Sequence, residues 1–387
     1  MNAARQPLHV VLAGTRGVPA RYGGFETAAE EIGARLAAMG HRVTVYCRNP
    51  GQRLREHRGM RLVNLPAVRR SAVDTLSHTG LSVAHMLREQ PDVVVLFNAA
   101  NAPFLPVLRA VGIPTAVHVD GLEWQRAKWQ GMGQRYYRAA ERWSVWLADA
   151  VVADSNGIRT HLRLSYGRDS IFIPYGAPIV HAGTARLGEF DLEPSGFHLV
   201  VARFEPENHV RLIVEGFRAS RATRPLIVVG SAPYSTRYMG EVRNAGRADS
   251  RVRFVGSVWD QELLNELYGN CLTYLHGHSV GGTNPSLLRA MGAGAPVLAY
   301  DVIFNREVAG ETGRYFTKQE DVATFVEHAE RTPSVERLRG KSGRERAYDW
   351  DDVAGRYAEL ASSLVWRGHK QLAPSRRRPS AIHGSAK

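Results

Sequence analysis

Apolar and polar residues divide the chain into short apolar runs separated by longer amphipathic stretches. Residues 26–39 carry apolar side chains at helical spacing and end at Gly40, which predicts a helix between two strands. Strands that alternate with helices are typical of a doubly wound α/β domain, which binds ligands beyond the carboxyl ends of its strands. The runs that predict strands in the first half are residues 9–13, 42–46, 92–97, 114–119, 148–154 and 171–176.

A second α/β series follows the first. Between the two, the pattern lapses into Gly, Pro, Ala, Thr and charged residues, so we place a linker at residues 181–196 between domains at 1–180 and 197–348. An amphipathic helix is expected at residues 349–366, and the basic, Ser- and Pro-rich tail at 367–387 is expected to be disordered. The second series of strands comprises residues 198–202, 226–230, 252–254, 271–275 and 297–300.

Composition indicates a soluble globular protein. The chain has 387 residues, of which 44% are hydrophobic and 22% charged, and this length suits two domains. Cys47 and Cys271 are far apart and form neither a disulfide framework nor a zinc motif, which favours a reducing cytoplasm. No apolar run has the length of a signal-peptide core or a membrane span. We expect a cytoplasmic protein, peripheral on the inner face of the cell membrane.

The net charge of +13 indicates an anionic partner: nucleic acid, lipid headgroups or a nucleotide sugar. The cations are spread through both halves rather than gathered on one face, so we expect no nucleic acid. Residues 124–146 are dense in aromatics and arginines, which suits an anionic membrane surface. Packing of half these rings into a helix core explains the pattern equally well. The residues expected on the acceptor or membrane side are Trp124, Arg126, Lys128 and Trp129.

A glycine-rich turn after the strand at 271–275 indicates an anion site. Gly281 and Gly282 permit a sharp turn, and Thr283 or Asn284 can cap a helix that has a proline in its first turn. Free N–H groups and the positive end of the helix dipole converge there. An ordinary strand–loop–helix connection is the alternative interpretation.

The first loop argues against hydride chemistry. Gly14 and Gly17 do not complete a G-x-G-x-x-G motif, and the second strand ends at Cys47 and Arg48 rather than at an acidic residue for a ribose.

Five segments of the chain carry a resemblance: G-T-R-G-V-P-A-R-Y-G-G-F-E-T at 14–27, D-G-L-E-W-Q-R-A-K-W at 120–129, V-A-R-F-E-P-E-N at 201–208, G-G-T-N-P-S-L-L at 281–288 and D-W-D-D-V-A-G-R-Y at 349–357. The segments at 201–208, 281–288 and 349–357 resemble, in that order, glycosyltransferase family 4. Its members have the GT-B fold, in which two Rossmann-like domains face each other across a cleft and the last helix crosses back to the first domain. The segments at 14–27, 120–129 and 281–288 resemble more closely the branch that holds bacterial polysaccharide rhamnosyltransferases.

The resemblance implies a nucleoside diphosphate sugar as the donor and a diphosphate as the leaving group, which fixed positive charge stabilises. Arg203 matches the family's phosphate-binding arginine, and Glu307 matches an acidic residue near the nucleotide or sugar. Backbone N–H groups at residues 282–284 would hold the diphosphate, and Gly23 and Gly24 would close over it. The donor-binding residues implied are Gly23, Gly24, Asn208, Gly281, Gly282, Thr283, Asn284, Arg289 and Glu307.

His118 and Asp120 lie at the carboxyl end of a strand of the first domain, where they are candidates for contacts with acceptor or donor-sugar hydroxyls. With Arg203 at the phosphates, they are the catalytic candidates. A core position for His118 is equally compatible with the sequence. Family members transfer with retention, generally without an identified protein nucleophile, and here the leaving phosphate would help to deprotonate the acceptor.

The chain departs from the family at two positions. The usual Glu-x7-Glu pair falls on Gly281 and Arg289, although the branch keeps a glutamate at the second place, where it accepts ribose hydroxyls. An arginine cannot accept a hydrogen bond. The family's phosphate lysine falls on Asn208, and Arg289 is a candidate replacement for that missing cation.

We expect no metal and no cofactor. Asp349 and Asp351 have the spacing of a metal-binding D-x-D, but acidic residues at the start of a helix are typical caps. His276 and His278 have no carboxylate or cysteine nearby in sequence to complete a metal site.

The leading hypothesis is a retaining glycosyltransferase for a lipid-linked or polysaccharide acceptor, with L-rhamnose from dTDP-rhamnose as the suggested sugar. The alternatives are an epimerase or phosphorylase of the same fold, a non-catalytic nucleotide-sugar-binding or scaffold protein, which Arg289 motivates, and a nucleic-acid binder.

Overall fold

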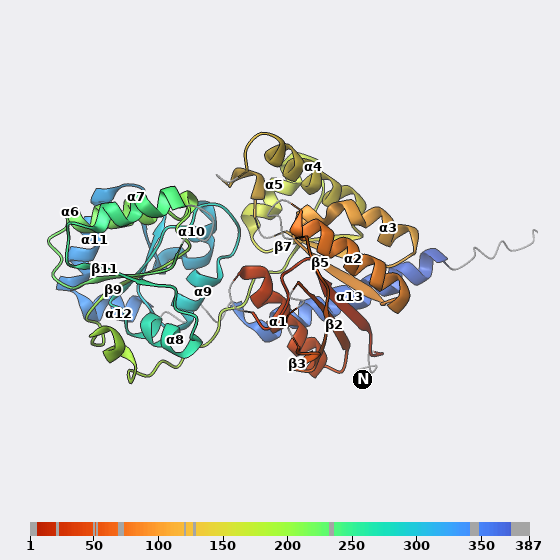
Figure 1. The fold of residues 1–387 in the computed structure, drawn as a ribbon, viewed down its shortest axis with the longest axis horizontal. Coiled ribbons are helices and arrows are strands. Elements are labelled where there is room, and N and C mark those ends of the chain that lie inside the picture. The colour runs from red at the N-terminus through yellow and green to blue at the C-terminus, as the bar shows by residue number, and fades with distance from the viewer. Residues whose placement is uncertain are drawn as a thin grey trace, which may run out of the picture.

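The computed structural model describes residues 6–20, 23–48, 51, 53–68, 73–119, 121–126, 129–231, 236–340 and 348–372. Two lobes lie side by side, and each is a parallel sheet flanked by helices (Figure 1). The predicted site residues Asp120 and Lys128 lie outside the described residues.

The sheet of the first lobe has the order β3-β4-β2-β1-β5-β6-β7-β8, and every pair is parallel except β3 with β4. Helices cover both faces, so β1, β5 and β6 are buried at every position, which explains their uninterrupted apolar sequences. The strands are β1 (His9–Ala13), β2 (Arg42–Cys47), β3 (Glu56–His57), β4 (Met60–Asn64), β5 (Val93–Phe97), β6 (Thr115–Val119), β7 (Ala150–Ala153) and β8 (Ile171–Phe172). The helices are α1 (Gly24–Ala38), α2 (Asp74–Glu89), α3 (Leu105–Ala110), α4 (Met132–Leu147) and α5 (Asn156–Tyr166), with 3-10 turns at Ala99–Phe104 and Glu123–Gln125.

The second lobe has a six-stranded sheet in the order β11-β10-β9-β12-β13-β14, parallel throughout. Its strands are β9 (His198–Val201), β10 (Leu226–Val229), β11 (Val252–Gly256), β12 (Thr273–His276), β13 (Val297–Tyr300) and β14 (Arg314–Phe316). Its helices are α6 (Val210–Ala219), α7 (Thr236–Gly246), α8 (Gln261–Asn270), α9 (Pro285–Gly292), α10 (Ile303–Ala309), α11 (Gln319–Arg331) and α12 (Pro333–Gly340), with 3-10 turns at Leu187–Phe190, Pro206–Asn208 and Gly310–Thr312.

The last helix, α13 (Trp350–Leu372), returns to the first lobe and packs against α1 and β5 (Figure 1). Val353, Tyr357 and Ala361 recur at helical spacing and are buried, so this face continues the first lobe's core. The predicted GT-B arrangement with its crossing helix is confirmed. The prediction that disorder begins at residue 367 is wrong for residues 367–372, which continue the helix, and residues 373–387 lie outside the described part.

Within the described residues, no helix combines the length and the apolar character that crossing a membrane requires.

Candidate active site

A cavity of about 870 Å³ lies between the two lobes, which is within the usual size range of small-molecule sites. The first lobe contributes α1 and the loop before it, and the second lobe contributes the carboxyl ends of β9, β10 and β12. The start of α13 also reaches the cavity. Of the predicted residues, Gly23, Gly24, Arg203, Asn208, Asn284 and Arg289 line it.

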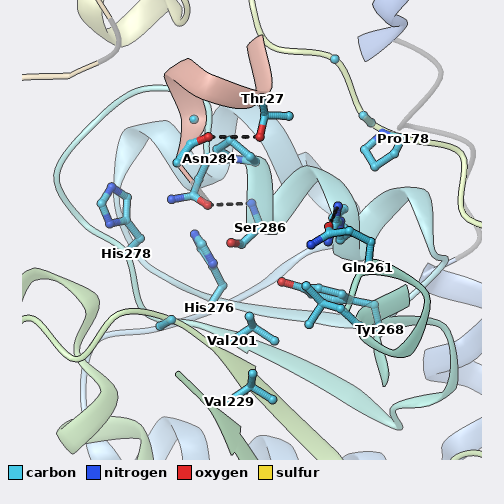
Figure 2. Close-up of a pocket in the computed structure, with 18 of the residues that line it drawn as sticks. Thr27, Pro178, Val201, Val229, Gln261, Tyr268, His276, His278, Asn284 and Ser286 are labelled. Carbon is cyan, nitrogen blue, oxygen red and sulfur yellow. Dashed lines mark hydrogen bonds between the residues drawn. The ribbon is translucent and has the colours of Figure 1, made fainter. Parts of the chain in front are cut away.

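Helix α9 begins at the cavity wall. The Asn284 side chain caps the helix, because its Oδ1 accepts a hydrogen bond from the Ser286 N–H at 2.9 Å, and Pro285 takes the first helical position (Figure 2). Leu287, Leu288 and Met291 are buried and fix the helix to its own lobe. The positive end of the α9 dipole therefore faces the cavity, as the glycine-rich turn predicts.

The turn before α9 contacts the other lobe instead of the cavity. The Thr283 N–H donates to Asp154 Oδ2 at 2.8 Å, and Thr283 Oγ1 donates to the Asp154 carbonyl at 2.6 Å. A Cβ atom on Gly282 would lie 1.8 Å from Asp154 Oδ1, and one on Gly121 would lie 3.0 Å from the Gly281 Cα. Gly281, Gly282 and Thr283 do not line the cavity, so this glycine pair permits close approach of the lobes, which corrects the expected role.

Arg203 follows β9, and its half-buried side chain lines the cavity. Asn208 supports it: the Asn208 Nδ2 donates to the Arg203 carbonyl at 2.7 Å, and its Oδ1 lies 2.7 Å from His278 Nδ1. Burial holds the pKa of His278 well below its usual value, and the charges of Arg126 and Arg203 lower it further. Asn208 thus joins the arginine loop to a neutral histidine rather than supplying the family's cation.

Among the described residues, three arginines line the cavity, and they differ in their partners. Arg35 on α1 is neutralised by Glu31 and by Asp351, whose Oδ1 lies 2.5 Å from the Arg35 Nε. Arg289 donates to Gln261 Oε1 at 2.8 Å. Among the ion pairs of the described residues, neither Arg203 nor Arg289 takes part, so both can bind an anion. Arg35 and Glu31 were not among the predicted site residues, although their spacing on α1 places them on one face.

His276 ends β12 and lies on the cavity wall, 4% exposed. Its Nδ1 is 3.1 Å from the Tyr274 hydroxyl, and burial lowers the pKa of His276 to about 3, so the ring is neutral. From the sequence, this histidine was a candidate only for a metal site.

The catalytic candidate His118 lies in the core of the first lobe and does not line the cavity. It is completely buried, stacks between aromatic rings that include Phe97 and Tyr175, and its Nδ1 is 2.5 Å from the Tyr357 hydroxyl on α13. Burial lowers the pKa of His118 to about 3. A contact with acceptor or sugar is therefore ruled out in this conformation, because α13 covers the side chain.

Glu307, predicted to lie near the nucleotide, instead joins the two lobes. Its carboxylate accepts hydrogen bonds from the Asn156 N–H at 2.8 and 3.0 Å, from Asn156 Nδ2 at 2.8 Å and from the Gly157 N–H at 3.3 Å. Glu307 is on α10 and these donors form the start of α5, so the carboxylate caps a helix of the other lobe.

The aromatic and basic residues assigned to the acceptor or membrane side are partly packed into the protein. Trp124 donates to Glu141 Oε2 at 3.3 Å, and the Trp129 ring lies 4.8 Å from that of Tyr137. The Arg126 side chain is 12% exposed and pairs with Glu123 at 2.7 Å.

The D-x-D segment forms the cap of α13. Asp349 Oδ1 accepts a hydrogen bond from the Asp351 N–H at 2.7 Å. Over the described ranges, no group of three or more His, Cys, Asp or Glu side chains has the geometry of a metal site.

Known proteins share this fold. Sucrose-phosphate synthase from Thermosynechococcus elongatus superposes with a TM-score of 0.78 at 20% identity, over 94% of this chain and 100% of that chain. HepE of Anabaena, in complex with UDP-glucose, gives a TM-score of 0.74 at 14% identity, over 92% of this chain and 100% of that chain. Both likenesses establish the GT-B architecture.

Two family models match consecutive parts of the sequence: a glycosyl transferase 4-like domain at residues 23–176 and a glycosyl transferases group 1 domain at residues 197–332. The O-antigen chain mannosyltransferase B of Escherichia coli is 25% identical over 131 residues, which are 33% of this chain and 34% of that protein. The match thus spans about a third of the relative. The two domain matches, with the GT-B fold, place the chain among the glycosyltransferases.

Proposed function

We propose that this protein transfers a sugar from a nucleoside diphosphate donor to a lipid-linked or polysaccharide acceptor in cell-surface glycan synthesis. The observation that carries the proposal is the convergence of Arg203 and the N-terminus of α9 on one interlobe cavity of about 870 Å³. The UDP-glucose complex of HepE and the O-antigen relative support the donor class and the glycan acceptor.

In the proposed reaction, the bond between the anomeric carbon and the diphosphate oxygen breaks while an acceptor hydroxyl oxygen bonds to the same carbon. The acceptor proton moves to a phosphate oxygen, and transfer occurs with retention. Arg203 and the α9 dipole stabilise the charge that develops on the leaving diphosphate. Gly23 and Gly24 line the cavity from the first lobe, and a Cβ atom on Gly24 would lie 3.4 Å from Pro285 Cγ at the start of α9.

Donor identity is tested by incubating the protein with labelled UDP-glucose, GDP-mannose or dTDP-rhamnose and a lipid-linked acceptor extract. L-rhamnose from dTDP-rhamnose stays our prediction for the sugar. Transfer of label from any one donor, lost in Arg203→Ala, supports the proposal. Absence of transfer and of donor hydrolysis with every nucleotide sugar would reject it.

Arg289 favours a second candidate, a nucleotide-sugar-binding protein without turnover. It lies on the cavity wall where the resemblance leads us to expect a carboxylate for the ribose, and its guanidinium offers only donors. Tight binding of a nucleotide sugar without transfer or hydrolysis would distinguish this candidate from the enzyme. In that case, Arg289→Glu is expected to introduce turnover.

We also propose that the enzyme works at an anionic membrane surface, on the cytoplasmic face. The outer face of α4 exposes Trp143 and Trp146, 45% and 48% accessible, together with Arg135, Arg138 and Arg142, while the acidic Glu141 on the same helix is buried. Such a face suits lipid headgroups, because its rings enter the interface and its cations meet the phosphates.

Co-sedimentation with vesicles tests the membrane proposal. The wild type should sediment with phosphatidylglycerol vesicles and less with phosphatidylcholine vesicles, and Trp143→Ser with Trp146→Ser should reduce the binding. Trp259→Ser is the matched control, because Trp259 is 58% exposed on the other lobe. Equal sedimentation of all variants with both vesicle types would contradict the proposal.

A further inference from the structure

Among the described residues that line the donor cavity, His276 alone holds a buried side-chain nitrogen or oxygen without a hydrogen-bond partner. This atom is Nε2. Figure 2 shows the imidazole ring pointing from the end of β12 toward Ser286 in the first turn of α9. A buried polar atom that the protein leaves unpaired requires an explanation, and a ligand in the adjoining cavity supplies one.

The contacts of the Tyr274 hydroxyl lead us to place the proton of the neutral ring on Nδ1. This hydroxyl can donate to the Val201 carbonyl at 3.4 Å, and its oxygen can accept the hydrogen of His276 Nδ1 at 3.1 Å. In a neutral imidazole with Nδ1 protonated, Nε2 carries a lone pair and is an acceptor. Its partner must therefore be a donor, such as a hydroxyl group, rather than an ionised phosphate oxygen.

The other strong acceptors on the cavity wall already have partners in the protein. Gln261 Oε1 accepts from Arg289, and Asn208 Oδ1 accepts from His278. The remaining amide and carboxylate side chains on the wall, each with an assigned protein donor, are Glu31, Asn284, Asp349 and Asp351. A nucleotide sugar brings several hydroxyl groups into this cavity, and His276, which lies on its wall, can accept from one at Nε2 when its ring turns toward the cavity.

We propose that His276 Nε2 accepts a hydrogen bond from a hydroxyl group of the nucleotide sugar, carried either by the ribose or by the transferred sugar. The inference rests on the proposed function and assigns to it a specificity-determining residue. If the ribose carries that hydroxyl, His276 takes over the acceptor role that Arg289 cannot fill.

Titration calorimetry tests this assignment with UDP, GDP and dTDP and with their glucose, mannose and rhamnose conjugates. The variants are His276→Phe, which keeps a ring without the acceptor, and His276→Gln, whose amide oxygen can accept. His78→Phe is the matched control, because His78 is also buried with unpaired ring nitrogens but does not line the cavity. We expect His276→Phe to raise the Kd for the ligand that binds most tightly by about tenfold. His276→Gln should recover much of the lost affinity, and His78→Phe should leave the Kd unchanged.

A 2′,3′-dideoxy nucleoside diphosphate separates the two sources of the hydroxyl. If the ribose supplies it, this analogue binds the wild type and His276→Phe equally, whereas the ordinary diphosphate binds the variant more weakly. If the transferred sugar supplies it, only binding of the sugar conjugate weakens. Unchanged affinity of His276→Phe for every ligand, or equal weakening of the diphosphate and its dideoxy analogue, would overturn the inference alone. A wild type that binds no nucleotide would overturn the proposed function as well.

Discussion

Glu307 gives the sharpest test of how the lobes are joined. Its carboxylate bonds the first two N–H groups of α5 at 2.8 to 3.3 Å and the Asn156 side chain at 2.8 Å. In Glu307→Gln the side chain keeps its shape but loses its charge and one acceptor oxygen. We call the arrangement in which Glu307 contacts α5 closed, and arrangements without this contact open. A charged hydrogen bond is stronger than a neutral one, so we expect the substitution to reduce the stability of the closed arrangement by about 1–2 kcal/mol relative to open ones.

That loss corresponds to a factor of about 5–30 in the population of the closed arrangement. Arg203 and α9 belong to the second lobe, whereas Gly23 and Gly24 belong to the first, so only the closed arrangement presents the complete donor cavity. Where closed and open molecules are comparably populated, the apparent Kd for a nucleoside diphosphate rises with the lost population.

Titration calorimetry measures that change, and small-angle scattering reports whether the radius of gyration increases. Glu320→Gln is the control, because Glu320 is an exposed glutamate in the first turn of α11, on the same lobe. An unchanged Kd and radius in Glu307→Gln, or an equal effect in Glu320→Gln, would refute the reasoning.

Two further substitutions test the packing between the lobes and the pH dependence of stability. Gly282→Ala places a Cβ atom 1.8 Å from Asp154 Oδ1, so transfer activity should fall more than about tenfold without loss of helical circular dichroism, whereas Gly188→Ala, with open space around it, should behave as the wild type. Activity of Gly282→Ala equal to that of the wild type would contradict the close packing. Burial of the Glu330 carboxylate opposes ionisation, but hydrogen bonds, the largest from His198, lower its pKa from 4.5 to about 2. Because the folded pKa lies below the ordinary value, this stabilisation is present above pH 4.5 and is lost as the pH falls toward 2. Glu330→Gln should flatten the acid side of a urea-midpoint profile measured from pH 6 to pH 3, and an unchanged profile would count against the assignment.

The sequence predicts those features of the fold that depend on residues close together in the chain. Apolar runs locate the buried strands, and the cap at Asn284 with Pro285 behind it follows from residues adjacent in the chain. Arg203 is placed in the site by its match to the family's phosphate-binding arginine at a strand end, and it does line the cavity.

Contacts between distant segments explain the errors. His118 lies near the carboxyl end of β6, as predicted, but Tyr357, which is 239 residues later in the sequence, covers its side chain. Glu307 and Asn156 are 151 residues apart, and Thr283 and Asp154 are 129 apart, so neither lobe-to-lobe contact leaves a local signal. His276 was overlooked because a histidine at the end of an apolar strand has the same sequence pattern whether its second nitrogen is paired or free.

The central claim is that Arg203 and the N-terminus of α9 together hold the donor diphosphate. The most direct measurement is calorimetric titration of wild type and Arg203→Ala with a nucleoside diphosphate and with the corresponding nucleoside. We predict that Arg203→Ala raises the Kd for the diphosphate by at least about tenfold and leaves the Kd for the nucleoside unchanged. Equal affinity of wild type and Arg203→Ala for the diphosphate would contradict the account.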